Sequence, residues 1–171
     1  LIVDEAQNLS VQALEELRLL SNVNIDSDIF LQLVLTGQPE LIEKLNRPEL
    51  VQFAQRIGVE FHLKALSYPE TQNYIEYRLE VAGAKHKIFS NEACAVIYCY
   101  SEGIPRRINN LCDFALVYAF ADDKKEIDVA LIQDMMRDKK SSRIVETKAS
   151  ENPDVKRVKS WLLEQHNIQI V

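Results

Sequence analysis

The most informative part of the sequence for the fold is LIVDEAQNL at residues 1–9. Its first three residues are apolar and β-prone, and two acids, Asp4 and Glu5, follow at once. Ser10 can then cap a helix over residues 11–21, where apolar side chains recur at helical spacing with acids on the other face. A buried strand that ends in acids and leads into a helix is typical of an open α/β sheet, which binds ligands at the carboxyl ends of its strands.

A second apolar run, IFLQLVL at residues 29–35, is nearly continuous and predicts a strand covered on both faces of a parallel sheet. The turn TGQP at residues 36–39 ends this strand, and helical stretches are expected over 40–46 and from 48 to about 58. The run VEFHLK at residues 59–64 alternates apolar and polar side chains. This alternation predicts a half-exposed strand at an edge of the sheet.

The chain changes character after residue 66 and becomes helical. Capping residues and helical periodicity predict four helices with short connections, and therefore a small bundle. The four helices are expected over residues 67–83, 90–103, 105–121 and 128–138, with N-caps at Ser67, Ser90 and Asp128. Residues 139–152, rich in Lys, Ser, Glu and Thr, are expected to form a linker. Residues 154–166 are expected to form an amphipathic helix whose Trp161 packs either on the body of the protein or on another protein.

The net charge of −6 is unevenly distributed along the 171 residues. Residues 1–137 carry 13 positive and 21 negative groups, a net of −8, whereas residues 138–171 carry 7 and 5, a net of +2. Nucleic acid is not an expected partner of such an acidic body, because DNA affinity depends on clustered Lys and Arg. The sequence has no signal peptide and no run of the roughly 18 apolar residues that a membrane span needs. Its three cysteines are typical of buried free thiols in a reducing compartment, so we expect a cytoplasmic protein, held at the inner face of the membrane only through a partner.

The acid pair predicts nucleotide chemistry. An apolar strand followed by Asp-Glu is the Walker B arrangement, in which Asp4 would hold Mg²⁺ through water and Glu5 would orient the attacking water. A polar residue at the end of the second strand, Thr36 or Gln38, would lie beside these carboxylates and could bond the γ-phosphate or the water. The alternative is that Asp4 and Glu5 are only the end of a strand and the start of a helix.

Arginines follow in an order that suits phosphoryl transfer. Arg56 precedes the predicted strand at 59–64, and GIPRR at residues 103–107 places Arg106 and Arg107 at a helix N-terminus, where backbone donors already favour phosphate. The alternatives are a surface ion pair for Arg56 and a solvated helix start for the other two.

Four motifs in the same order carry a family resemblance. LIVDEAQNL at 1–9, the leucine-rich stretch at 14–22, TGQPEL at 36–41 and GIPRRIN at 103–109 closely resemble the general secretion pathway protein A (ExeA-like) branch of the AAA+ ATPases. The resemblance covers roughly residues 1–137. It implies an α/β fold made of the C-terminal part of a P-loop parallel-sheet core and a small all-helical lid domain. The expected divisions are core at 1–66, lid at 67–138, and a basic linker with a short amphipathic tail at 139–171.

The resemblance also implies roles for single residues, ATP and Mg²⁺ as ligands, and action as a homo-oligomer. The family's roles fall on these positions: magnesium on Asp4, catalysis on Glu5, γ-phosphate sensing on Gln38 with Thr36 as second choice, the arginine finger toward a neighbour's ATP on Arg56, and the lid phosphate sensor on Arg106, favoured over Arg107.

The sequence departs from the family in one respect: no Gly-x-x-x-x-Gly-Lys-[Ser/Thr] loop occurs in it. In the family, the strand before that loop lies between the strands expected here at 30–35 and 59–64. We therefore expect a chain that begins inside Walker B and alone neither binds nor hydrolyses ATP appreciably.

The resemblance implies that the intact protein is a motor or assembly ATPase of a secretion or pilus assembly system, acting on a protein partner. Two alternatives remain at this point. The first is an accessory ATPase of DNA transposition or replication, and the second is a nucleotide-independent protein-interaction module.

Overall fold

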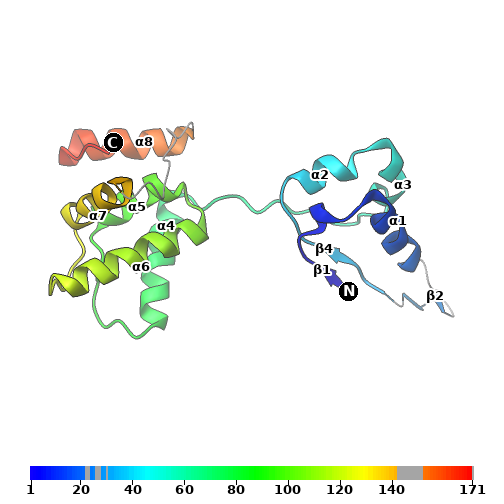
Figure 1. The fold of residues 1–171 in the computed structure, drawn as a ribbon, viewed down its shortest axis with the longest axis horizontal. Helices are drawn as coiled ribbons and strands as arrows, with labels where there is room; N and C mark the ends of the chain where they lie inside the picture. The colour runs from blue at the N-terminus through cyan, green and yellow to red at the C-terminus, as the bar shows by residue number, and fades with distance from the viewer. Residues whose placement is uncertain (22–23, 26–27, 30, 142–151, 171) are drawn as a thin grey trace. The chain divides into compact units, whose positions relative to one another are not determined.

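The computed structural model describes residues 1–171 except 22–23, 26–27, 30, 142–151 and 171. The chain forms two compact units, Leu1–His62 and Leu63–Val171, and each has its own core (Figure 1).

The first unit is built on two parallel strands that lie side by side in Figure 1, β1 (Ile2–Val3) and β4 (Val34–Leu35). Ile2 is aligned with Val34 and Val3 with Leu35. Backbone hydrogen bonds continue the pairing beyond the strands, from Thr36 N–H to the Val3 carbonyl and from Ala6 N–H to the Thr36 carbonyl, both at 2.9 Å. The pairing therefore brings the residues that follow the two strands together at one edge.

Short helices make up most of the remaining regular structure described in this unit. They are η1 (Ala6–Asn8), α1 (Val11–Leu20), α2 (Glu40–Leu45), η2 (Pro48–Leu50) and α3 (Val51–Ala54). The predicted cap at Ser10 is confirmed, since its hydroxyl accepts from Ala13 N–H at 3.0 Å. Leu14 and Leu50 are fully buried and, with Phe53, form the small core of this unit.

Two strand predictions need correction. The apolar run at 29–35 does not form one strand covered on both faces. Only Val34–Leu35 pairs with β1, Val34 is 48% exposed, and Asp28–Ile29 (β3) pairs antiparallel with Asn24–Ile25 (β2). Phe30 lies outside the described residues.

The predicted strand at 59–64 is also wrong: these residues form no strand, and Val59, Phe61 and Leu63 are 82–88% exposed. Alternation predicts which face is apolar, but a strand persists only beside a partner whose backbone completes its hydrogen bonds. Among the described residues no strand pairs with this run.

The second unit is helical, as predicted. Its helices are α4 (Tyr68–Val81), α5 (Asn91–Ser101), α6 (Pro105–Ala121), α7 (Val129–Ser141) and α8 (Pro153–His166). The central helix is α5, which contacts the other four and has eight of its eleven residues buried. An apolar helix covered on nearly all sides is expected at the centre of a bundle.

The predicted N-caps of this unit are confirmed. Ser67 and Glu70 form a capping box, the Ser90 hydroxyl accepts from Ala93 N–H at 3.1 Å, and the Asp128 carboxylate accepts from Leu131 N–H at 2.9 Å.

Gly103 joins α5 to α6 at φ 74°, where a Cβ would lie 1.9 Å from the Leu66 carbonyl oxygen. Leu66 N–H in turn donates to the Gly103 carbonyl at 2.9 Å. The backbone that enters the bundle thus lies directly against the start of α6, and only glycine fits.

The predicted amphipathic helix is confirmed as α8, which packs on α5 with Val155 and Leu162 fully buried. The Trp161 ring lies 6.1 Å from that of Tyr68, so it packs within this unit. The predicted linker at 139–152 begins inside α7, and its residues 142–151 lie outside the described residues. None of the helices in the described part of the chain is both long and apolar enough to cross a bilayer.

Candidate functional site

The parallel pairing of β1 and β4 brings Asp4 and Thr36 together. The Thr36 hydroxyl donates to Asp4 Oδ1 at 2.5 Å, and Glu5 N–H donates to the same oxygen at 2.9 Å. Both hydrogen bonds stabilise the charged form of Asp4 and so hold the pKa of its carboxyl below the ordinary value. The bond from Thr36 has the larger effect. The result is an exposed, ionised carboxylate with a hydroxyl beside it at the carboxyl ends of two parallel strands.

Glu5 has a left-handed backbone conformation, with φ 53° and ψ 35°. This conformation is uncommon for a residue other than glycine and costs of order 1–3 kcal/mol where the surroundings impose it. Here it reverses the chain between β1 and η1 and leaves the Glu5 side chain exposed. The Glu5 Oε2 atom accepts from the Gln7 side-chain amide at 2.5 Å. Glu5 is therefore held at its backbone and at its carboxylate.

The turn after β4 approaches Gln7 from the other side. Gln38 N–H donates to Gln7 Oε1 at 3.1 Å, so it is the backbone of Gln38 that the structure connects to the acid pair. At Gly37 a Cβ would lie 2.6 Å from Gln7 Oε1. Of the two residues expected to sense phosphate, Thr36 is the one whose side chain contacts Asp4.

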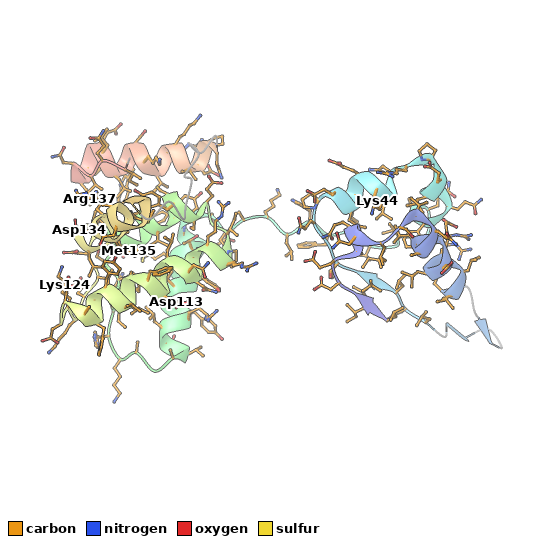
Figure 2. All side chains as sticks on the ribbon, in the orientation of Figure 1. Lys44, Asp113, Lys124, Asp134, Met135 and Arg137 are labelled. Atoms are coloured by element: carbon orange, nitrogen blue, oxygen red, sulfur yellow. The ribbon has the colours of Figure 1, made fainter. Side chains whose placement is uncertain are left out.

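Lys44 of α2, labelled in Figure 2, fixes the turn that carries Gln7. Its ammonium group donates to the carbonyl of Gln7 and, at 2.7 Å, to that of Leu9. A half-buried cation on two carbonyls satisfies acceptors that a one-turn helix leaves unpaired.

Sequence reasoning missed Gln7 and Lys44. The sequence does show that Gln7 follows Glu5 by two residues. This spacing does not reveal which groups its side-chain amide contacts.

The predicted arginines lie on exposed positions. Arg56 follows α3 in the first unit, and Arg106 lies in the first turn of α6 in the second. Arg107 Nη1 is 3.9 Å from the Glu102 carboxylate, an exposed ion pair of little energetic weight. Within the described part of the chain, Arg56 and Arg106 have no ion pair.

The donor set suits Mg²⁺ bound together with a phosphate ligand. Asp4, Glu5 and Thr36 present exposed oxygen atoms, the ligand type that Mg²⁺ prefers. Among the described residues no group of three or more His, Cys, Asp or Glu side chains could hold a metal ion. Such a site fits an ion that keeps several waters and binds through one or two carboxylates and substrate phosphates, rather than one enclosed by protein ligands.

The fold and this edge of the strands define the class of protein: the C-terminal part of an AAA+ P-loop core followed by its helical lid. The RuvB Holliday junction branch migration motor of Thermotoga maritima is similar in structure, with a TM-score of 0.57 and 15% identity over 99% of this chain and 52% of that chain. The ORC2 protein of Aeropyrum pernix is similar with a TM-score of 0.62 and 16% identity over 98% of this chain and 52% of that chain. At such identities the likeness shows the fold alone.

Sequence comparison is more specific. An AAA domain family model matches residues 1–45. General secretion pathway protein A of Aeromonas hydrophila is 47% identical over 126 residues, which are 74% of this chain and 23% of that protein. The chain is therefore a homologue of part of general secretion pathway protein A and contains part of an AAA domain. It spans less than a quarter of the length of that relative.

Proposed function

We propose that this chain supplies the hydrolytic acids and the lid of an ATP-hydrolysing AAA+ motor or assembly ATPase of the secretion type, which acts as a homo-oligomer on a protein partner. The observation that carries the proposal is the Asp4 carboxylate, kept ionised by Thr36 at the shared end of two parallel strands, with Glu5 next to it. Ligands of open α/β sheets bind at that edge. The secretion setting rests on the name of the Aeromonas relative.

In this proposal Asp4 is the Walker B acid that holds Mg²⁺, with Thr36 as its hydrogen-bonding neighbour. Bound Mg²⁺ would neutralise charge on the β- and γ-phosphates. Glu5 orients the attacking water and accepts its proton, a role that requires a carboxylate of fixed direction. Its left-handed backbone and its contact with Gln7 support that assignment.

We propose Arg56 as the arginine finger toward the ATP of a neighbouring subunit, and Arg106 as the residue that reads the γ-phosphate. Thr36 or Gln38 would sense the same phosphate. Exposure without an ion-pair partner among the described residues leaves both guanidinium groups available. Arginine suits these roles because its planar fork binds phosphate oxygens in pairs.

We propose further that a phosphate-binding loop outside these 171 residues completes the nucleotide site, since none occurs within them. The chain alone should then bind ATP only weakly. Titration calorimetry with Mg²⁺-ATP tests this, and a micromolar dissociation constant for residues 1–171 would contradict it.

The catalytic assignment is tested in the intact protein that contains the loop. Glu5→Gln should abolish turnover and preserve ATP binding, because it removes the proton acceptor and keeps the side-chain shape. Glu16→Gln is the matched control, since Glu16 is exposed on α1. Equal turnover in the two variants would remove Glu5 from the catalytic role.

The finger assignment is tested by mixing subunits. Arg56→Ala should be inactive alone, but mixing it with a Glu5→Gln subunit should restore part of the activity, because each site would then combine an intact acid with an intact finger. Absence of complementation in mixed oligomers would exclude Arg56 as the finger.

A further inference from the structure

We propose that Gln7 is the positioning residue of the site: it fixes the direction of the Glu5 carboxylate and couples it to the Thr36–Gln38 turn. This inference rests on the proposed function, because it assigns a role toward the residue proposed to activate water. It adds a residue outside the acid pair and the arginines.

The two hydrogen bonds of the Gln7 side chain determine its orientation chemically. A backbone N–H can only donate, so the atom that faces Gln38 N–H at 3.1 Å must be the amide oxygen. An ionised carboxylate can only accept, so the group that faces Glu5 Oε2 at 2.5 Å must be the amide NH₂. Only one of the two orientations of the Gln7 amide makes both hydrogen bonds. Glu5 and Gln38 therefore favour the same orientation.

Two further neighbours fit the observed position of Gln7. Lys44 binds its main-chain carbonyl from α2, and the missing side chain at Gly37 leaves room for its amide oxygen. A half-buried side chain restrained at both ends can transmit a displacement, whereas a free one would rotate away.

The coupling follows from the positions of the partners. The Thr36–Gln38 turn carries the hydroxyl that bonds Asp4 and the N–H that bonds Gln7. Within the described part of the chain, Gln7 is also the one side chain that bonds the Glu5 carboxylate. A ligand that shifts this turn will therefore move the catalytic carboxylate through a single amide.

The decisive variant is Gln7→Glu in the intact, ATP-hydrolysing protein. It keeps an acceptor for Gln38 N–H and replaces the donor that faces Glu5 with a second carboxylate. We expect kcat at neutral pH to fall at least about tenfold, because a second carboxylate would repel the Glu5 carboxylate instead of donating a hydrogen bond to it. The KM for ATP should stay within about twofold, because interactions that act only in the transition state leave ground-state binding unchanged.

Two other variants complete the test. Gln7→Ala should also lower kcat by about tenfold and leave the KM for ATP unchanged, since it removes positioning and adds no charge. Gln12→Glu is the matched control, because Gln12 Nε2 faces the Glu16 carboxylate at 3.4 Å on the exposed side of α1. Its kcat should equal that of the unchanged protein. The charged groups that adjoin the Gln7 turn, Asp4 and Lys44, are the same in all three variants.

A second measurement separates this inference from the proposed function. In the ¹⁵N-labelled protein, the Gln7 side-chain NH₂ signals should shift between the unchanged protein and Glu5→Gln, and Gln7→Ala should shift the Gln38 amide signal. If the protein turns over no ATP, the proposed function fails and these signals decide the inference. If turnover is normal in Gln7→Glu, or the NH₂ signals ignore Glu5, the inference is overturned.

Discussion

Leu162→Ala tests whether α8 is an integral part of the helical unit. Leu162 is fully buried where α8 packs on α5, whereas its neighbour Leu163 is 51% exposed. The substitution removes three carbon atoms, worth roughly 2.4 kcal/mol at about 0.8 kcal/mol for each buried CH₂. An unfilled cavity adds to this loss, so we expect a total of about 3 kcal/mol, within the 2–5 kcal/mol typical of such changes.

The loss should be visible in thermal unfolding. For a unit of about 110 residues, about 3 kcal/mol corresponds to a Tm decrease of roughly 12 °C, at about 4 °C for each kcal/mol. Trp161 is the one tryptophan in the chain and lies in α8 against Tyr68, so its fluorescence reports on this helix directly. Circular dichroism at 222 nm reports on the helices together.

Leu163→Ala is the control, and it should change Tm by no more than about 2 °C, because surface substitutions usually stay within about 0.5 kcal/mol. Equal Tm values for the two variants would refute the docking of α8 on α5. So would a separate transition in which tryptophan fluorescence changes well below the main loss of helix.

Three further predictions concern backbone, charge and thiols. Gly103→Ala should prevent folding of the helical unit or lower its Tm far more than Gly83→Ala; both glycines have a positive φ, but a Cβ at Gly103 would also lie 1.9 Å from the Leu66 carbonyl oxygen, whereas one at Gly83 would meet nothing within 4 Å. Similar melting curves would contradict this. Thr36→Val should raise the pKa of Asp4, measured by carboxyl NMR titration, because it removes the main hydrogen bond that lowers it. Since the Asp4 pKa is lowered in the fold, its contribution to stability is present above its ordinary pKa and lost as pH falls, so Thr36→Val should weaken the decrease in stability upon acidification. Burial raises the pKa of all three cysteine thiols to about 12, so iodoacetamide at pH 8 should modify them only after denaturant is added, and rapid labelling of the native protein would disprove it.

The features that could be predicted from the sequence are those determined by residues close together in the chain. The caps at Ser10, Ser67, Ser90 and Asp128 were readable because a capping side chain acts on backbone groups only a few residues away. The meeting of the acid pair with the turn after the next apolar run was also predictable, since parallel strands bring their carboxyl ends to the same edge.

The errors and omissions involve groups distant in sequence. The run at 59–64 has the alternation of a strand, but pairing depends on a neighbour that the pattern does not contain. The contacts of Gln7 depend on the left-handed backbone of Glu5 and on the space at Gly37, neither of which propensity reveals. The amphipathic pattern of α8 predicted a helix with an apolar face, and only the bundle shows that α5 covers that face.

The close approach of Leu66 to Gly103 has a mechanical consequence. Leu66 is where the chain enters the bundle, and its peptide group is bonded to the residue three positions before Arg106. The entrance to the bundle is therefore fixed at two points, by the backbone just before α6 and by the contact of the Leu66 side chain with the hydrophobic core.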